Sequence, residues 1–187
     1  YQSLAPAKPG AMVPPPATHP ASVPPKAAPR DRDPQPAVGP VDPDKRERSL
    51  KASNEGTKAY GQRQFETAID RYTMATTHWP DNHVAWYGLA STHAKKRDWG
   101  RASEAASRAV AIAPGESMYH LLYGFLLYEK AVRQAREAAA ARQNIPADQV
   151  TPDLSAVSFE KAKVHLEAAL QLNSGLWRAH YYLGRIH

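Results

Sequence analysis

The stretch HVAWYGLASTHAKKRDWGRASEAASRAVAIAPGE, residues 83–116, repeats the pattern of the 34 residues before it. Numbered within this block, positions 4, 7, 8, 17, 20, 24, 27 and 32 hold Trp86, Leu89, Ala90, Trp99, Ala102, Ala106, Ala109 and Pro114. In residues 49–82, positions 8, 17, 20, 24, 27 and 32 hold Gly56, Phe65, Ala68, Tyr72, Ala75 and Pro80. Small residues at a fixed interval and a closing proline predict stacked pairs of helices.

This spacing resembles the tetratricopeptide repeat, in which small residues at positions 8, 20 and 27 let two helices approach closely. The resemblance covers residues 49–187 and implies an all-α solenoid. Its repeats would be 49–82, 83–116 and 117–176, followed by a partial fourth repeat at 177–187. Pro80 and Pro114 would end second helices, and Asp81 or Asn82 would cap the next helix.

The third repeat carries an insertion at about 130–158. Residues 129–143, EKAVRQAREAAAARQ, have high helix propensity and would continue the first helix of the repeat. Thr151, Pro152 and Asp153 form a helix-start pattern, with residues 144–150 as the bend. We therefore expect a lengthened helical hairpin that projects beyond its neighbours.

Residues 1–48 differ in composition from the rest, because they hold 13 of the 17 prolines and few large apolar residues. This part is predicted to be an extended or disordered arm, serving as a spacer or docking segment. An Ala/Pro-rich spacer is common in bacterial envelope proteins, which favours a periplasmic or outer-membrane-associated location over a cytoplasmic one. No apolar run reaches the length of a membrane helix.

Charge and residue usage exclude several function classes. The net charge of +6 is spread along the chain, so nucleic acid is not expected as a partner. The cluster Lys95, Lys96, Arg97 and Arg101 is interpreted as a solvated turn between helices. The chain has no cysteine, which rules out disulfides and thiolate chemistry within it.

No cofactor, metal or catalytic site is predicted. None of the eight histidines forms an i, i+4 pair, and no nucleophile or phosphate-binding motif occurs. His120 and His180 fall at repeat position 4, and His93 and His187 at position 11, which are packing positions. We therefore interpret these histidines as structural and the chain as non-catalytic.

The resemblance places positions 2, 5, 9, 12 and 13 of each repeat on a concave face. The partner-binding groove would then comprise Tyr60, Val84, Tyr87, Ser91, Lys95, Met118, Leu121, Phe125, Tyr128, Arg178, Tyr181 and Arg185. It would be aromatic and apolar with a basic end, suited to an extended or helical protein segment. A related subfamily grips chaperone tails with a carboxylate clamp. Its positions here hold Ser53, Thr57, Gly88, Met118 and Leu122, none of which matches.

The function predicted from these patterns is a protein–protein interaction scaffold or adaptor. It would bind one partner in the groove and another through the proline-rich arm. A more specific hypothesis is assembly of a bacterial pilus or secretion complex, as in similar repeat lipoproteins. Two alternatives stay open: a permanent subunit of a large complex with its arm threaded over neighbours, and a regulatory region of a longer enzyme.

Overall fold

The computed structural model describes residues 42–186, and these form an all-α fold without strands. The helices are α1 (Pro43–Gly61), α2 (Phe65–His78), α3 (His83–Lys95), α4 (Trp99–Ile112), α5 (Ser117–Gln143), α6 (Glu160–Leu172) and α7 (Trp177–Ile186), with a short 3₁₀ turn at Ala147–Gln149. None of these helices is long and apolar enough to span a bilayer.

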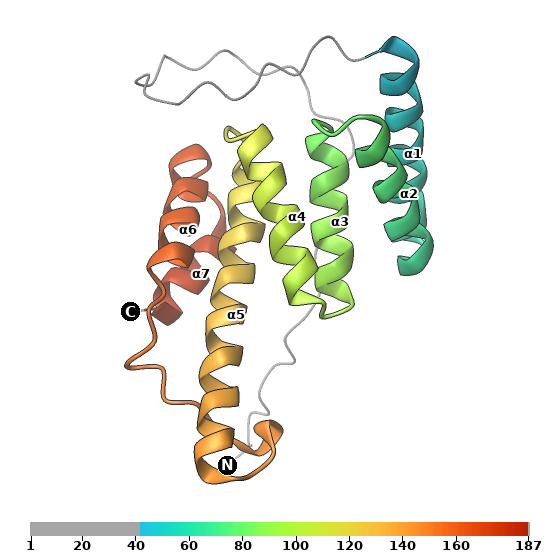
Figure 1. Ribbon diagram of the computed structural model, residues 1–187. Coiled ribbons are helices and arrows are strands. Elements are labelled where there is room, and N and C mark those ends of the chain that lie inside the picture. The colour runs from blue at the N-terminus through green and yellow to red at the C-terminus, as the bar shows by residue number, and fades with distance from the viewer. Residues whose placement is uncertain (1–41, 187) are drawn as a thin grey trace, which may run out of the picture. The chain divides into compact units, whose positions relative to one another are not determined.

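The helices stack as consecutive antiparallel hairpins, α1 with α2, α3 with α4 and α5 with α6 (Figure 1). The first helix of each hairpin contacts the first helix of the next, so α1, α3, α5 and α7 form one continuous layer. We call the face that these four helices share the inner face. The predicted all-α solenoid is confirmed over these residues.

The start of the folded region differs from the predicted boundary at Ser49. Helix α1 begins at Pro43, and the Asp42 carboxylate accepts a hydrogen bond from the Asp44 backbone amide at 3.0 Å. Aspartate before a proline is a good helix start, because proline at the first helical position has no amide to leave unpaired. The rest of the predicted arm, residues 1–41, lies outside the described residues.

Tyr72 packs at the junction of the first two repeats. The Tyr72 side chain on α2 is 1% exposed, and its ring lies against Gly56 of α1 and Gly88 of α3. A Cβ atom at Gly56 would lie 2.9 Å from Tyr72 Cδ1, and one at Gly88 would lie 2.3 Å from Tyr72 Cζ. Both glycines are therefore needed for the close approach of α1, α2 and α3. The role predicted for Gly56 is confirmed.

The turns inside the first two hairpins have the same left-handed conformation. Arg63 and Arg97 have φ angles of 62° and 60°. Each is followed by an amide that bonds back into the helix, from Gln64 to the Ala59 carbonyl and from Asp98 to the His93 carbonyl, both at 2.9 Å. This arrangement satisfies carbonyls at the helix end and turns the chain toward the second helix.

The prediction for the insertion is half wrong. Helix α5 continues to Gln143 as expected, and it runs beyond its neighbours in Figure 1. The return segment, however, is not helical, and α6 begins only at Glu160. The Asp153 carboxylate accepts a hydrogen bond from the Ser155 amide at 2.9 Å, which closes a local turn instead of capping a helix.

The return segment packs apolar residues against the third hairpin without forming a helix. Val150 and Phe159 are buried at 7% and 8% exposure, and Leu154 and Val157 pack against the cluster of Tyr128, Phe159 and Ala162. Val150, Leu154 and Val157 are spaced as residues on one helical face, so the spacing of the apolar residues does not account for the irregular path. Pro146 and Pro152 disfavour a continuous helix.

Candidate functional site

The predicted groove residues differ in how far they are open to solvent. Val84, Tyr181 and Arg185 are exposed, whereas Lys95, Met118, Phe125 and Arg178 are half-buried. The remaining five, Tyr60, Tyr87, Ser91, Leu121 and Tyr128, are buried. The expectation of an open aromatic groove is therefore wrong for most of its aromatic members.

Near the middle of the inner face, Tyr87 is held by ring contacts to the next repeat. It stacks on Tyr119 of α5, with ring centroids 4.8 Å apart. The Tyr119 hydroxyl lies 2.8 Å from Nδ1 of His83 on α3. Burial raises the pKa of both phenols, so they remain neutral. Tyr87 therefore serves mainly to join α3 to α5.

A second aromatic cluster lies where α5 meets α7. Tyr128 is 3% exposed and contacts Phe159 and Tyr182, with centroids 5.3 and 5.5 Å away. Phe125 lies between Trp99 and Tyr182, at 6.2 and 5.2 Å. At the edge of this cluster, Arg185 donates to the hydroxyls of Tyr128 and Tyr181 at 2.9 and 3.1 Å. Arg185 is therefore fixed in position while its side chain remains exposed.

Leu121 and Met118 pack into a core cluster and do not line an open groove. Leu121 lies in a core cluster with Leu166, Ala169 and Ala179, and Met118 packs against that cluster. These two side chains therefore join α5 to α6 and α7. Their assignment to the groove is corrected.

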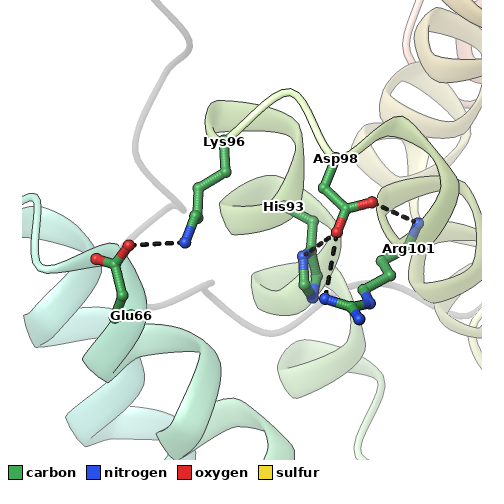
Figure 2. Close-up of polar contacts among 5 residues, drawn as sticks. All are labelled: Glu66, His93, Lys96, Asp98 and Arg101. Carbon is green, nitrogen blue, oxygen red and sulfur yellow. Dashed lines mark hydrogen bonds and ion pairs between the residues drawn. The ribbon is translucent and has the colours of Figure 1, made fainter.

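The basic residues at the end of α3 separate into two groups. Lys96 points to α2 and pairs with Glu66, with Nζ 2.7 Å from Oε1 (Figure 2). Figure 2 also shows the Asp98 carboxylate between His93 and Arg101, at 3.5 Å from each. Asp98 caps α4 as well, because its Oδ1 accepts from the Arg101 amide at 3.2 Å. These charges stabilise the turn.

Lys95 differs from its neighbour. It is half-buried, and its pKa is lowered first by burial and then by the positive charges of Arg63 and Arg178. The charge of Arg178 also acts on the Tyr87 phenol, where it opposes the larger effect of burial, which raises the pKa. Sequence reasoning missed Arg63, because position 15 of the repeat lies in a turn and outside the expected groove positions.

The five clamp positions of the chaperone-tail receptors are mostly packed inside the solenoid. Ser53 and Leu122 are 3% and 8% exposed, and a side chain at Gly88 would overlap the Tyr72 ring. The Thr57 hydroxyl lies 3.0 Å from the Tyr72 hydroxyl. These positions serve repeat packing here.

The predicted structural role of the histidines at position 4 agrees with their contacts. His120 donates from Nε2 to the carbonyl of Pro114 at 3.0 Å, and His180 donates to the carbonyl of Ser174 at 3.1 Å. Trp86, at the same repeat position, donates to the carbonyl of Pro80 at 2.7 Å. A ring N–H at position 4 therefore satisfies a carbonyl at the end of the preceding repeat. His187 lies outside the described residues.

One histidine contact was not foreseen, because its partners are far apart in sequence. Nδ1 of His120 lies 3.1 Å from Nδ1 of His165 on α6. Since Nε2 of His120 carries the proton given to Pro114, Nδ1 of His120 accepts and His165 donates. Within residues 42–186, no group of three His, Cys, Asp or Glu side chains is placed to hold a metal ion.

These histidines make stability depend on pH. Burial lowers the pKa of His83, His93 and His165 below the ordinary value of 6.5. The unfolded chain therefore binds more protons than the folded one below pH 6.5, and folding stability falls as the pH drops. Urea unfolding at a series of pH values should show this fall. His165→Gln should make it less steep, whereas an unchanged slope would assign the effect to other groups.

Comparison with known proteins agrees with this architecture. Residues 54–117 match the tetratricopeptide repeat family. The fold is similar to the first TPR of Spaghetti (RPAP3) bound to the HSP90 peptide SRMEEVD, with a TM-score of 0.56 and 23% identity over 75% of this chain and 91% of that chain. Residues 54–117 are therefore identified as tetratricopeptide repeats, and residues 42–186 have the all-α solenoid fold of such repeats.

Two curated proteins show sequence similarity. Small glutamine-rich tetratricopeptide repeat-containing protein 2 of Saccharomyces cerevisiae is 28% identical over 119 residues, which is 63% of this chain and 34% of that protein. E3 ubiquitin-protein ligase CHIP of Arabidopsis thaliana is 28% identical over 76 residues, 41% of this chain and 27% of that protein. The matches thus span about a third or less of either relative.

Proposed function

We propose that this protein is a non-catalytic adaptor that holds a segment of a protein partner against the inner face of α1, α3, α5 and α7. The main support is the set of side chains that stay exposed to solvent on these helices. Val84 and Tyr181 are 46% and 50% exposed, and Arg185 is held by two tyrosine hydroxyls with its charge toward solvent. Such a surface combines apolar contact area with oriented donors, as peptide-binding surfaces do.

Similar proteins support a binding role of this kind. The Spaghetti domain of similar fold is bound to an HSP90 peptide, which supports peptide binding as a role of this fold. We do not propose a chaperone tail as the partner of this protein. Two positions that would need clamp residues serve packing instead, because Gly88 lies under the Tyr72 ring and Leu122 is buried. We further propose that the adaptor acts in the assembly of a bacterial envelope complex. The support for this is the Ala/Pro-rich composition of residues 1–48.

The docking proposal is tested with exposed residues, since Tyr87→Ala or Tyr128→Ala would remove packed rings and unfold the repeats. A photo-reactive amino acid at position 84 or 181 should crosslink to one partner in the native source. The same group at Met74, which is 45% exposed on α2, should not. Val84→Ala combined with Tyr181→Ala should weaken capture about tenfold while stability changes by less than about 0.5 kcal/mol. Equal crosslinking from all three positions would count against an inner-face site.

A permanent structural subunit is the second candidate, and one observation favours it. Trp177, Val164 and Leu172 are 67%, 58% and 47% exposed on α6 and α7. This apolar surface is what a fixed neighbour would cover. A protein that is monomeric after purification and binds its partner reversibly would favour the adaptor. Aggregation cured only by co-expression with the partner would favour the subunit.

A further inference from the structure

Two imidazole rings meet across the third hairpin. Nδ1 of His120 on α5 and Nδ1 of His165 on α6 lie 3.1 Å apart, and the ring centroids are 5.3 Å apart. His120 is buried and His165 is half-buried. Their contact differs from those of His83, His93 and His180, which meet a hydroxyl, a carboxylate and a carbonyl. Two side chains of the type that binds metals therefore face each other here.

The repeat fold does not require a histidine at either position. At position 4, Trp86 meets the preceding carbonyl with its one ring N–H, whereas His120 brings a second ring nitrogen. His165 lies one residue before position 24 of its repeat, where the first two repeats have Arg71 and Ala105. Ala105 is 4% exposed, so alanine fills this place in a hairpin of the same fold. The facing nitrogens are therefore additional to what packing needs.

His120 is fixed in the form that a metal ligand needs. Its Nε2 donates to the Pro114 carbonyl at 3.0 Å, so the proton lies on Nε2 and the lone pair of Nδ1 faces His165. A backbone carbonyl on the far nitrogen is a usual second contact of a metal-binding histidine, because it sets the tautomer and the orientation of the ring. His165 is therefore the ring that must adapt.

His165 can provide the second lone pair. It donates from Nδ1 to His120, but no hydrogen bond among the described residues holds its Nε2. The proton on Nδ1 can therefore move to Nε2 without loss of another contact, and the ring packs against Tyr123 with centroids 4.5 Å apart. Burial, and then the nearby His120, lower the pKa of His165, so the ring is neutral near neutral pH, as a ligand must be.

The separation of the two nitrogens suits one metal ion. Zn²⁺ binds imidazole nitrogen at about 2.0–2.1 Å, so two such ligands on a tetrahedral ion lie about 3.3 Å apart. The observed 3.1 Å needs a change of only about 0.2 Å, together with a turn of the His165 ring toward the ion. Within residues 42–186 no third His, Cys, Asp or Glu side chain completes a metal-binding group, so water would fill the other coordination positions.

We infer that His120 and His165 form a two-histidine site for a divalent late first-row metal ion, such as Zn²⁺, that joins α5 to α6. Neutral imidazole suits Zn²⁺, Ni²⁺ and Cu²⁺, whereas Mg²⁺ and Ca²⁺ prefer oxygen ligands. With only two protein ligands, the ion exchanges readily with solvent. The site acts on the hairpin that carries the long extension of α5, and it does not depend on partner docking at the inner face.

Zn²⁺ alone, added to the full chain, tests the site. At about ten times its dissociation constant, Zn²⁺ should raise the midpoint of thermal unfolding by about 4 °C, and a chelator should reverse the shift. Mg²⁺ should have no effect. His165→Gln keeps a donor for Nδ1 of His120 but removes a ligand, so it should abolish most of the shift. His165→Ala, which introduces the residue of the second repeat, should do the same.

His180→Gln is the matched control and should keep the full shift. His180 has the same repeat position as His120 and contacts a carbonyl through Nε2 in the same way, but it contacts no second histidine among the described residues. Absence of a shift in the unaltered chain would overturn the site. An equal shift in the His165 variants, or an equal loss in His180→Gln, would do so too.

If neither His165 variant folds, NMR of the histidine ring nitrogens in the unaltered chain decides the question. Zn²⁺ should move the Nδ1 signals of His120 and His165 together and at the same concentration. Movement of other histidine signals without these two would overturn the proposal.

Discussion

Gly88→Ala is expected to lower the free energy of unfolding by about 3 kcal/mol, although alanine is the better helix former. The added Cβ would lie 2.3 Å from Cζ and 2.4 Å from Cε1 of Tyr72. That ring is 1% exposed and enclosed by α1 and α3, so it has no open space to move into. The repeats must separate instead, and packing around Tyr72 is lost. The gain in helix propensity offsets only about 1 kcal/mol of this cost.

Urea denaturation followed by far-UV circular dichroism measures the effect, with Gly61→Ala as the control. Nothing lies within 4 Å of a Cβ atom at Gly61, so alanine there should be neutral or stabilise by up to about 1 kcal/mol. Combining Gly88→Ala with Tyr72→Leu should cost less than the sum of the two changes, because the smaller side chain relieves the overlap. Additive losses would mean that Gly88 and Tyr72 do not meet as described.

The repeat pattern predicted the hairpins but not how they join. Small residues at positions 8, 20 and 27 indicate where two helices approach closely. The structure agrees, because the residues there include four fully buried alanines, Ala68, Ala75, Ala90 and Ala102. Gly88 falls at position 6, outside that pattern. A small residue is required at Gly88 because the Tyr72 ring of the preceding repeat lies against it. This contact follows from how the repeats stack, which the repeat pattern does not show. The irregular return from α5 was missed because the Thr151, Pro152 and Asp153 pattern favours a helix start, whereas the Asp153 carboxylate closes a turn with the Ser155 amide.

The groove was predicted less well than the fold. Its positions were chosen by their place on the first helices, but Tyr87 and Tyr128 meet rings of Tyr119 and Tyr182 and become buried. Lys95 and Lys96 are adjacent in sequence, yet successive side chains point about 100° apart around a helix. Lys96 therefore pairs with Glu66 on α2, whereas Lys95 is half-buried and has no part in that ion pair. Sequence alone gives no means of separating them without the positions of Glu66 and Arg63.

Asn82→Ala should destabilise the chain by about 3 kcal/mol, because this one amide serves both neighbouring repeats. Its Oδ1 accepts from the Ala85 amide at 3.0 Å, which confirms the predicted cap of α3. Its Nδ2 donates to Oγ of Ser49 at 2.9 Å, and Ser49 donates to the Ala75 carbonyl at 2.7 Å. Asn82 and Ser49 are 1% and 0% exposed, so water cannot replace a lost partner.

Substitutions can distinguish the contribution of the Asn82 side-chain oxygen from that of its NH₂ group. Asn82→Asp keeps an acceptor for the Ala85 amide but removes the donor to Ser49 and buries a carboxylate, so its loss should be larger at neutral pH than at low pH, where the protonated side chain can donate again. Asp98→Ala removes a cap at a more exposed turn and should cost only about 1 kcal/mol. Ser49→Ala should cost less in the Asn82→Ala background than alone, since the bond between the two side chains is already gone and only the bond to the Ala75 carbonyl remains to be lost. A full additional loss would show that Ser49 acts through the Ala75 carbonyl alone, and that α1, α2 and α3 are not joined by this chain of hydrogen bonds.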